Sequence, residues 1–283
     1  MAPGIIPYVL IFLLLMPLRA GAEALRIVSL YPGHTDNIVA LGEEKKLVGI
    51  SQSDDDDMLP QLKRFSPKSS AEEILALKPD LVLTRSLAER QNPQQRRVLE
   101  RAGVRVVSIE PPKWDEFSSY LRELASLIGC DPEEAEAKLK AVRNSISAEA
   151  AKRSKGRSPA VFVEATAREL HTCSPGSWAA KLIELAGGRN AAYDAEEIRA
   201  GSAIAPYGLE RILKAAAAGR IDIYLVQQGA MNAADMKSLE ARPWYQALKD
   251  IKKAVVPERE LSRPSLLGLE AGGKRLIKIF YGE

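Results

Sequence analysis

The residues best suited to chemistry in this chain are its two histidines, His34 and His171. Imidazole nitrogens are common ligands for iron, zinc and cobalt. Two histidines that face each other could therefore bind a metal centre as its axial ligands. A bare zinc or manganese site usually needs three or four His, Asp or Glu ligands, and two histidines fall short of that number. Taken singly, each histidine can equally be a structural or surface residue, and this alternative stays open.

Aromatic and cationic side chains form the second group of candidate binding residues. Tyr31, Trp178 and Tyr207 offer ring faces that could stack on a flat ligand, although aromatic residues are more often part of a core. Arg85 could pair with a carboxylate of such a ligand, because the guanidinium fork matches carboxylate geometry. Ser53 joins this group because it lies in a polar loop directly behind a predicted strand.

Four adjacent acids, Asp54 to Asp57, lie in the same polar loop. Calcium prefers oxygen ligands, but an EF-hand loop supplies them from alternate positions. Because this run lacks that spacing, we expect a solvated acidic loop, with a calcium site as the alternative.

The sequence lacks the motifs of α/β enzymes. It has no G-x-S-x-G elbow, no G-x-G-x-x-G after a predicted strand and no P-loop. Cys173 follows His171 by two positions, which does not make a catalytic dyad on an extended segment. We therefore predict a protein that is not an enzyme and carries no cofactor.

The N-terminal residues have the pattern of a secretory signal peptide. Residues 5–15 are almost unbroken apolar sequence, and Ala20-Gly21-Ala22 supplies a small-residue cleavage site. We expect residues 1–22 to be a cleaved signal peptide and the mature chain to be soluble outside the cytoplasm. Residues 1–4 carry no Lys or Arg, so an uncleaved anchor is the alternative.

Composition fits a globular protein of two domains. The chain has 283 residues, of which 27% are charged, and its formal net charge is only +3. This balance gives no reason to expect nucleic acid as a partner. Removing the signal leaves about 260 residues, more than one core usually holds. Cys130 and Cys173 could pair in an oxidising compartment, but the sequence does not decide whether they do.

Short apolar strands alternate with helical segments along the rest of the chain. In the first half the pattern predicts strands at 26–30, 47–50, 81–84 and 104–109 and helices at 35–41, 70–77, 94–102 and 114–128. In the second half it predicts strands at 160–164, 221–226 and 254–256 and helices at 178–186, 208–218 and 264–280. Such alternation implies parallel strands joined by right-handed crossovers.

A long, mostly polar helix separates the two halves. Asp131 is a predicted N-cap, with Pro132 at the first helical position. The predicted fold class is α/β, with two three-layer lobes of mainly parallel sheets joined by one long rigid helix. The predicted boundaries are a first lobe at 25–129, the linking helix at 130–155 and a second lobe at 156–283.

The fold class indicates where a ligand would bind. Ligands of open parallel sheets lie beyond the carboxyl ends of the strands. This rule selects the loops 31–34, 51–57, 84–86 and 166–178. We therefore expect a ligand site at these strand ends, with Tyr207 as a further aromatic contact.

In this order and spacing the motifs resemble those of the class III periplasmic binding proteins, the receptors for ferric siderophores, haem and cobalamin. The resemblance covers residues 26–281 and is carried by RIVSLYPGHTDNIVALG, LVGIS, SSAEEILALKPDLVL, AAKLIELAGGRNAA and LERILKAAAAGRIDIYLV. It implies a monomeric periplasmic receptor that captures an iron or cobalt chelate in a cleft and delivers it to the permease of an ABC importer. Members of this family often begin the first loop with Ser-Pro rather than Tyr-Pro-Gly-His.

The resemblance also implies docking residues. Glu72, with Glu73 beside it, and Glu210 correspond to acidic residues that meet arginine pockets on the permease. Charge-assisted contacts of this kind are stronger than neutral hydrogen bonds. From the residues alone, these glutamates could simply favour a helix N-terminus or be solvated. Three other functions stay open, namely a receptor for a bare metal ion or small oxyanion, an envelope α/β enzyme, and an anchored interaction module without a ligand.

Overall fold

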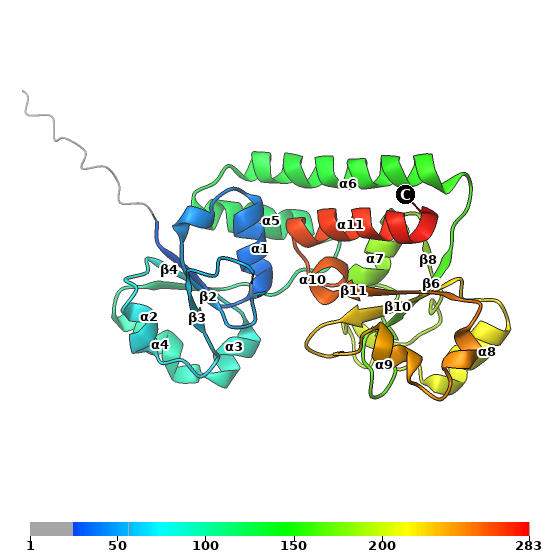
Figure 1. Ribbon diagram of the computed structural model, residues 1–283. Helices are drawn as coiled ribbons and strands as arrows, with labels where there is room; N and C mark the ends of the chain where they lie inside the picture. The colour runs from blue at the N-terminus through cyan, green and yellow to red at the C-terminus, as the bar shows by residue number, and fades with distance from the viewer. Residues whose placement is uncertain (1–24, 56, 283) are drawn as a thin grey trace, which may run out of the picture.

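The computed structural model describes residues 25–55 and 57–282. The predicted signal peptide falls on residues that lie outside this part of the chain. The described residues form two α/β lobes side by side, with helices layered along one face of both (Figure 1). None of the helices in this part of the chain is both long and apolar enough to cross a membrane.

The first lobe is built on a parallel sheet of strand order β3-β2-β1-β4-β5. The strands are β1 (Ile27–Ser29), β2 (Leu47–Ser51), β3 (Lys63–Phe65), β4 (Leu81–Thr84) and β5 (Arg105–Ser108). The helices are α1 (Pro32–Ala40), α2 (Ala71–Leu75), α3 (Ser86–Gln91), α4 (Pro93–Arg101) and α5 (Phe117–Ile128), with a 3-10 turn at Glu44–Lys46. Strands β1 and β4 are buried along their whole length, as expected for central parallel strands covered by helices on both faces.

The second lobe repeats this plan with a smaller parallel sheet of order β11-β10-β6-β8. Its strands are β6 (Ala160–Glu164), β8 (Arg189–Asn190), β10 (Ile223–Gln228) and β11 (Lys252–Pro257), and β7 (Thr172–Cys173) pairs antiparallel with β9 (Ile204–Ala205). Its helices are α7 (Trp178–Leu185), α8 (Leu209–Ala217), α9 (Met236–Glu240), α10 (Glu258–Leu261) and α11 (Leu266–Tyr281), with a 3-10 turn at Tyr245–Leu248.

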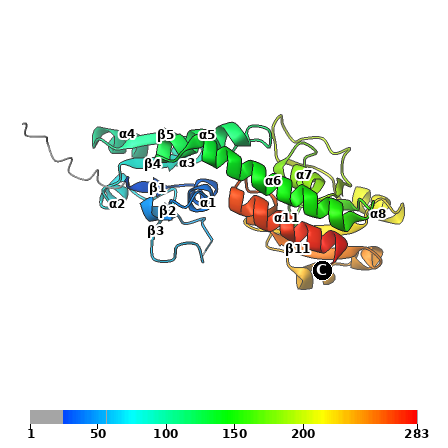
Figure 2. The same cartoon turned by 90° about the horizontal axis from the view of Figure 1, so that it is seen from above.

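Helix α6 (Pro132–Ser154) crosses both lobes, and α11 of the second lobe also contacts the first. The 23 residues of α6 give a length of about 35 Å. Helix α11 runs beside α6 in two perpendicular views and reaches α1 of the first lobe (Figures 1 and 2). Close packing of the pair depends on Gly273, because a Cβ there would stand 2.5 Å from Ile146 Cδ1. The sequence predicted α6 as the single link and assigned the last helix to the second lobe alone.

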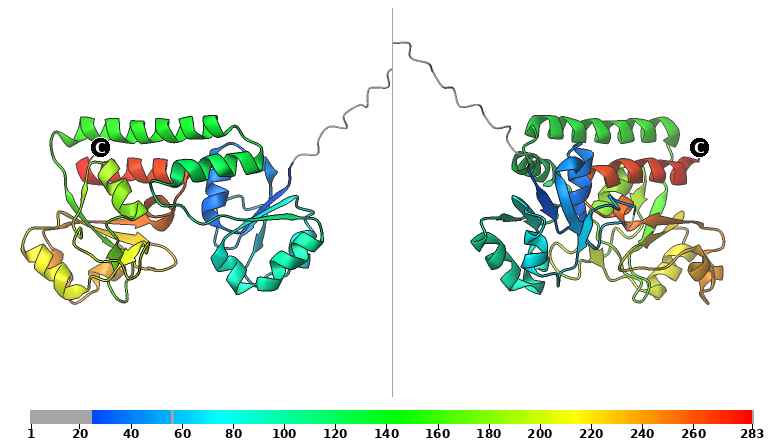
Figure 3. Two further views of the ribbon diagram at one scale, coloured as in Figure 1. Left: turned by 180° about the vertical axis from the view of Figure 1, so that it is seen from behind. Right: turned by 60° about the vertical axis from the view of Figure 1, so that its left-hand side comes forward.

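The lobes also share a hydrophobic core. One cluster of buried side chains runs from the first sheet through α5, α6, α7 and α11 to the second sheet. At its centre the ring of Trp178 packs 4.8 Å from the rings of both Trp114 and Phe117, measured between centroids. The view from behind shows α6 running along both lobes, with α5 and α11 end to end beneath it (Figure 3). A continuous core of this kind limits how far the lobes can move apart.

The two cysteines are free thiols in this structure. Cys173 is buried in β7, and Cys130, after α5, is half-buried with its thiol 3.4 Å from Glu43 Oε1. The structure therefore contains no disulfide between them.

Candidate functional site

The carboxyl ends of several strands meet where the two lobes touch. Strand β1 leads into α1 and β4 leads into α3 in the first lobe, while β11 leads into α10 in the second. Helices α1 and α10 both lie at this contact, which we call the lobe junction (Figure 1). In open parallel sheets this is the edge at which ligands bind.

Tyr31 and Arg85 come together on the first-lobe side of this edge. The Arg85 guanidinium lies 4.5 Å from the centroid of the Tyr31 ring, a cation–π contact. Burial raises the pKa of Tyr31 to about 12, although the positive charge of Arg85 acts in the other direction. Tyr31 is therefore a neutral phenol at physiological pH. Arg85 forms no ion pair with any other residue in the described ranges.

His34 is a structural residue, which contradicts its prediction as a ligand. Its side chain is fully buried, with Nδ1 2.9 Å from the Tyr120 hydroxyl and Nε2 3.2 Å from the Thr84 carbonyl oxygen. Because a carbonyl oxygen can only accept, Nε2–H donates to Thr84 and Nδ1 accepts from Tyr120. Burial lowers the pKa of His34 to about 4. Neither ring nitrogen is available to a metal centre in this arrangement.

His171 lies on the loop between β6 and β7 in the second lobe. Its Nε2 is 3.0 Å from Glu169 Oε2, and only 15% of its side chain is exposed. Since His34 is enclosed within the first lobe, the observed contacts do not bring the two histidines to a common metal. The described residues also contain no group of three or more His, Cys, Asp or Glu placed to hold a metal ion.

Two of the predicted aromatic contacts lie in cores. Trp178 is 5% exposed and packs between the lobes, so it is not a wall of the ligand site. Tyr207 is 7% exposed, with its ring between Phe162 and the guanidinium of Arg211. It precedes α8, which lies on the side of the second lobe away from the first (Figure 1). Ser53, in contrast, is exposed at the start of the acidic loop, and its amide donates to Ser51 Oγ at 3.1 Å.

The glutamates proposed for docking are exposed on both lobes. Glu72 and Glu73 lie in the first turn of α2, whose N-cap Ser70 accepts a hydrogen bond from the Glu73 amide. Glu210 lies in the first turn of α8. Helices α2 and α8 are at opposite ends of the molecule, on the side away from α6 (Figure 1). The structure shows no ion pair for these three residues within the described part of the chain.

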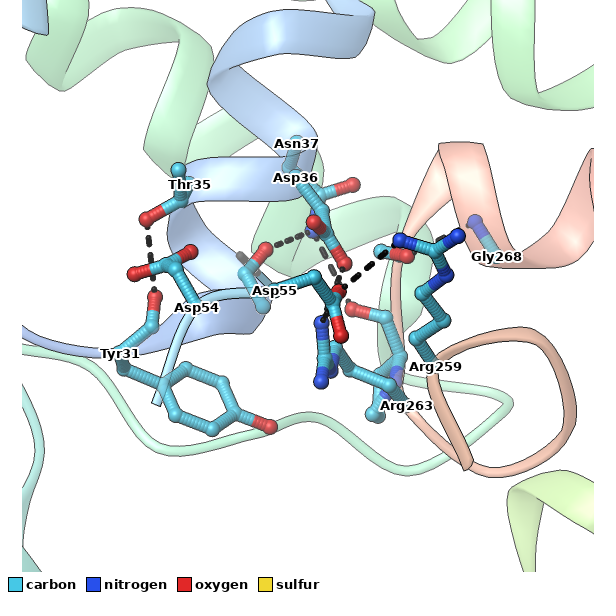
Figure 4. Close-up of polar contacts among 12 residues, drawn as sticks. Tyr31, Thr35, Asp36, Asn37, Asp54, Asp55, Arg259, Arg263 and Gly268 are labelled. Carbon is cyan, nitrogen blue, oxygen red and sulfur yellow. Dashed lines mark hydrogen bonds and ion pairs between the residues drawn. The ribbon is translucent and has the colours of Figure 1, made fainter. Parts of the chain in front are cut away.

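The structure contains a cluster of ion pairs across the lobe junction that was not predicted from the sequence (Figure 4). Arg263 Nη1 lies 3.3 Å from Asp36 Oδ2 and 3.1 Å from Asp55 Oδ2. Arg259 Nη1 lies 3.4 Å from Asp55 Oδ2 and 3.2 Å from Asp57 Oδ1. The three acids belong to the first lobe and the two arginines to the second. We call these five residues the ionic junction.

Asn37 adds neutral hydrogen bonds at the same place. Its Oδ1 accepts from the Leu266 amide at 2.9 Å, and its Nδ2 donates to the Pro264 carbonyl at 3.2 Å. One of the backbone amides at the start of α11, which has no partner within its own helix, thus donates to a residue on α1. The fully buried Asn37 therefore fixes the end of α11 against the first lobe.

Asp54, at the start of the acidic run, is buried, which the sequence did not predict. The acidic run was predicted to be solvated, yet Asp54 is 4% exposed, and neither of its carboxylate oxygens has a hydrogen-bond partner among the described residues. It lies beside Thr35 on α1 (Figure 4). Burial raises the pKa of Asp54 to about 7, and the nearby charge of Asp36 acts in the same direction. Its backbone is held by Arg64, whose Nη1 donates to the Asp54 carbonyl at 2.8 Å.

Two hollows of the molecule differ in their position relative to this site. A groove of about 960 Å³ lies between α6 and α11, outside the strand ends. A hollow of about 200 Å³ lies at the lobe junction between Asp36, Met58, Arg259 and Gly268. Pockets for drug-sized ligands usually measure about 300–1,000 Å³. The smaller hollow is therefore too tight for a tetrapyrrole in this arrangement of the lobes.

The sequence model described as "Periplasmic binding protein" matches residues 27–256. Vitamin B12-binding proteins of Yersinia pestis and Yersinia pseudotuberculosis are 28% identical to this chain over 184 residues. The match covers 64% of this chain and 64% of those relatives, so it spans less than two thirds of their length.

Solved structures with the same fold cover most of the chain. A possible iron-binding periplasmic solute-binding protein from Staphylococcus epidermidis has a TM-score of 0.70 at 22% identity, covering 90% of this chain and 98% of its own. A periplasmic haem-binding protein from Pseudomonas aeruginosa has a TM-score of 0.68 at 23% identity, covering 90% and 92%. The periplasmic vitamin B12-binding protein of Vibrio cholerae has a TM-score of 0.63 at 18% identity, covering 90% and 96%.

Proposed function

Since the chain belongs to the periplasmic binding protein family, we propose that it captures a metal chelate for an ABC importer. The chelate classes are a ferric siderophore, haem or cobalamin. Relatives named for vitamin B12 and structural neighbours named for haem and iron support this choice. The observation that carries it is the lobe junction, where strand ends of two parallel sheets meet and present Tyr31 beside Arg85.

Arg85 and Tyr31 are the proposed ligand contacts on the first lobe. Arg85 has no carboxylate partner within the described residues, so an acidic group of the ligand can pair with its guanidinium. The ring of Tyr31 would then contact the face of the same guanidinium. Ser53 and His171 remain proposed contacts from the acidic loop and from the second lobe. Because the hollow at the junction is small, we propose that the lobes turn apart to admit a ligand of this size.

Delivery would use the exposed glutamates. We propose that Glu72 and Glu73 on one lobe and Glu210 on the other contact basic pockets of a permease. Their positions at opposite ends of the same face support this role, since a partner can then bind both lobes at once (Figure 1). We further propose that the protein is exported by a cleaved signal peptide, acts as a monomer in the periplasm and catalyses no reaction.

A small oxyanion is the second candidate ligand. The same guanidinium of Arg85, which has no ion pair within the described residues, favours it, because arginine binds oxyanions such as phosphate through two parallel hydrogen bonds. A bare metal ion has less support, since the described residues contain no cluster of three suitable ligands.

Quenching of tryptophan fluorescence tests the proposal. The mature protein is titrated with haemin, cyanocobalamin and several ferric siderophores, all of which absorb tryptophan emission. We expect one of them to quench saturably at one-to-one stoichiometry. Arg85→Gln should weaken that binding at least tenfold, whereas the matched change Arg90→Gln, at an exposed position on α3, should leave it unchanged. If no chelate quenches and phosphate or sulfate protects the protein against heat, the oxyanion proposal replaces the chelate.

A further inference from the structure

The ionic junction connects residues that are far apart in the sequence. Asp55 and Arg263 are separated by 208 positions, yet Oδ2 and Nη1 lie 3.1 Å apart. Asp55 also contacts Arg259, so this one carboxylate links the acidic loop to two arginines of the second lobe. The loop after β2 is therefore the element of the first lobe through which most of these contacts pass.

The acidic loop carries a carboxylate that is buried without an ion-pair partner in the described part of the chain. Asp54 is adjacent to Asp55 in the chain, and its own oxygens lack hydrogen-bond partners within the described part of the molecule. An ionised carboxylate in such a place is unstable unless it is paired, whereas the neutral acid is tolerated. Burial and the neighbouring charge of Asp36 both favour the protonated form of Asp54.

The charges that face Asp54 make a second negative charge unfavourable. Asp36 on α1 brings a negative charge near Asp54, whereas Arg263, in the segment after α10, and the Thr35 hydroxyl act in the opposite direction. The three acids of the ionic junction already outnumber its two arginines by one. Ionisation of Asp54 would increase this excess to two at a site that water does not reach.

We propose that the acidic loop is a proton-controlled latch between the lobes, fastened while Asp54 is protonated and loosened when Asp54 loses its proton. The ionised side chain must turn towards water, which rotates the loop backbone. Asp55 is the next residue, so the same rotation moves its carboxylate away from Arg263. The second lobe then keeps the Asn37 hydrogen bonds and the shared core but loses contacts of the latch.

The latch acts whether or not the bound solute is a metal chelate. Protonation of Asp54 favours the fastened lobes. It therefore raises the affinity for the solute if the fastened state binds the solute better, and lowers that affinity if the loosened state does. The midpoint of the transition is expected near the pKa of Asp54, about 7. Small changes of external pH around neutrality would therefore change the population of fastened lobes.

Distances between spin labels on the two lobes test the latch. The labels are placed at Arg97→Cys on α4 and Lys237→Cys on α9, both exposed positions, in a Cys130→Ser background of the mature protein. We expect a longer and broader distance distribution at pH 8.5 than at pH 5.5. Asp54→Asn should hold the short distribution at both pH values, and Asp55→Asn should give the long distribution at both.

A second measurement separates loss of the latch from misfolding. Infrared difference spectra between pH 8.5 and 5.5 should contain the carbonyl band of a buried carboxylic acid, and Asp54→Asn should remove that band. Circular dichroism establishes that each variant is folded. A distance distribution that does not change with pH in the unmodified protein would overturn the proposal. So would a pH-dependent change that persists in Asp54→Asn.

Discussion

Replacing Asp54 by asparagine should make the protein more stable at neutral and alkaline pH. The pKa of Asp54 is raised from 3.8 to about 7, a shift of about three units. Each unit corresponds to about 1.36 kcal/mol, so ionisation penalises the folded state by about 4 kcal/mol at most. Relaxation of the loop towards water reduces this value, and we expect about 2–4 kcal/mol.

The sign of the pH dependence follows from proton binding. Between pH 3.8 and pH 7 the unfolded chain releases the proton of Asp54 while the folded chain retains it. The contribution of Asp54 to the free energy of unfolding therefore falls as pH rises through this window and is constant above about pH 7. Asparagine does not titrate, so the variant lacks this contribution.

Urea unfolding at pH 4, 5, 6, 7 and 8, followed by tryptophan fluorescence, measures the effect. The free energy of unfolding of Asp54→Asn minus that of the unmodified protein should rise by about 2–4 kcal/mol between pH 4 and pH 8. Other titrating groups cancel in this difference. As a control, Asp57→Asn alters a neighbouring acid whose side chain is 76% exposed, and its difference should change little. A difference for Asp54→Asn that is independent of pH would refute the reasoning.

Three further substitutions test the core and the structural role assigned to the histidine. His34→Ala should lower the free energy of unfolding by about 2–4 kcal/mol in urea titrations, because it removes the only acceptor of the buried Tyr120 O–H among the described residues, and it should leave the absorption spectrum of any bound chelate unchanged. Trp178→Ala should cost about 3–5 kcal/mol by the same assay, since it opens a cavity between the lobes; a loss below 1 kcal/mol would contradict the shared core. Gly273→Ala should lower the melting temperature in calorimetry, because the new methyl group overlaps Ile146 and overpacking costs about 1–3 kcal/mol; an unchanged melting temperature would show that α6 and α11 can separate freely.

Local signals in the sequence predicted the elements well. Asp131 and Pro132 placed the start of α6, and the structure has the Asp131 side chain accepting from the Glu133 amide at 2.8 Å. Ser70 likewise caps α2 as predicted. These features depend on residues within one turn of each other, so the sequence contains all the information that they need. The agreement was incomplete, since α1 begins at Pro32 rather than at position 35 and α5 begins at Phe117 rather than at position 114. The short elements β3, α3, α9 and α10 were not predicted at all.

The predicted site was less accurate because its geometry depends on distant partners. His34 pairs with Tyr120, 86 positions away, and Asp36 pairs with Arg263, 227 positions away. Nothing near His34 in the sequence indicates whether its nitrogens are satisfied. Strand-end reasoning did find the region that holds Tyr31 and Arg85, since it depends only on the parallel topology.

The ionic junction and the shared core hold the lobes with different strengths. Ion pairs that are partly exposed contribute at most about 1 kcal/mol each, and only Asp36 with Arg263 is deeply buried in this cluster. The core beneath Trp114 and Trp178 gains about 25 cal/mol for each Å² of apolar surface removed from water, over many side chains. The core is therefore the stronger connection, and a change of charge at Asp54 can alter the angle between the lobes without separating them. Because α10 lies on the side of α11 away from α6, the lobes would turn about the α6–α11 layer, and this motion opens the edge that carries the proposed ligand contacts (Figure 1).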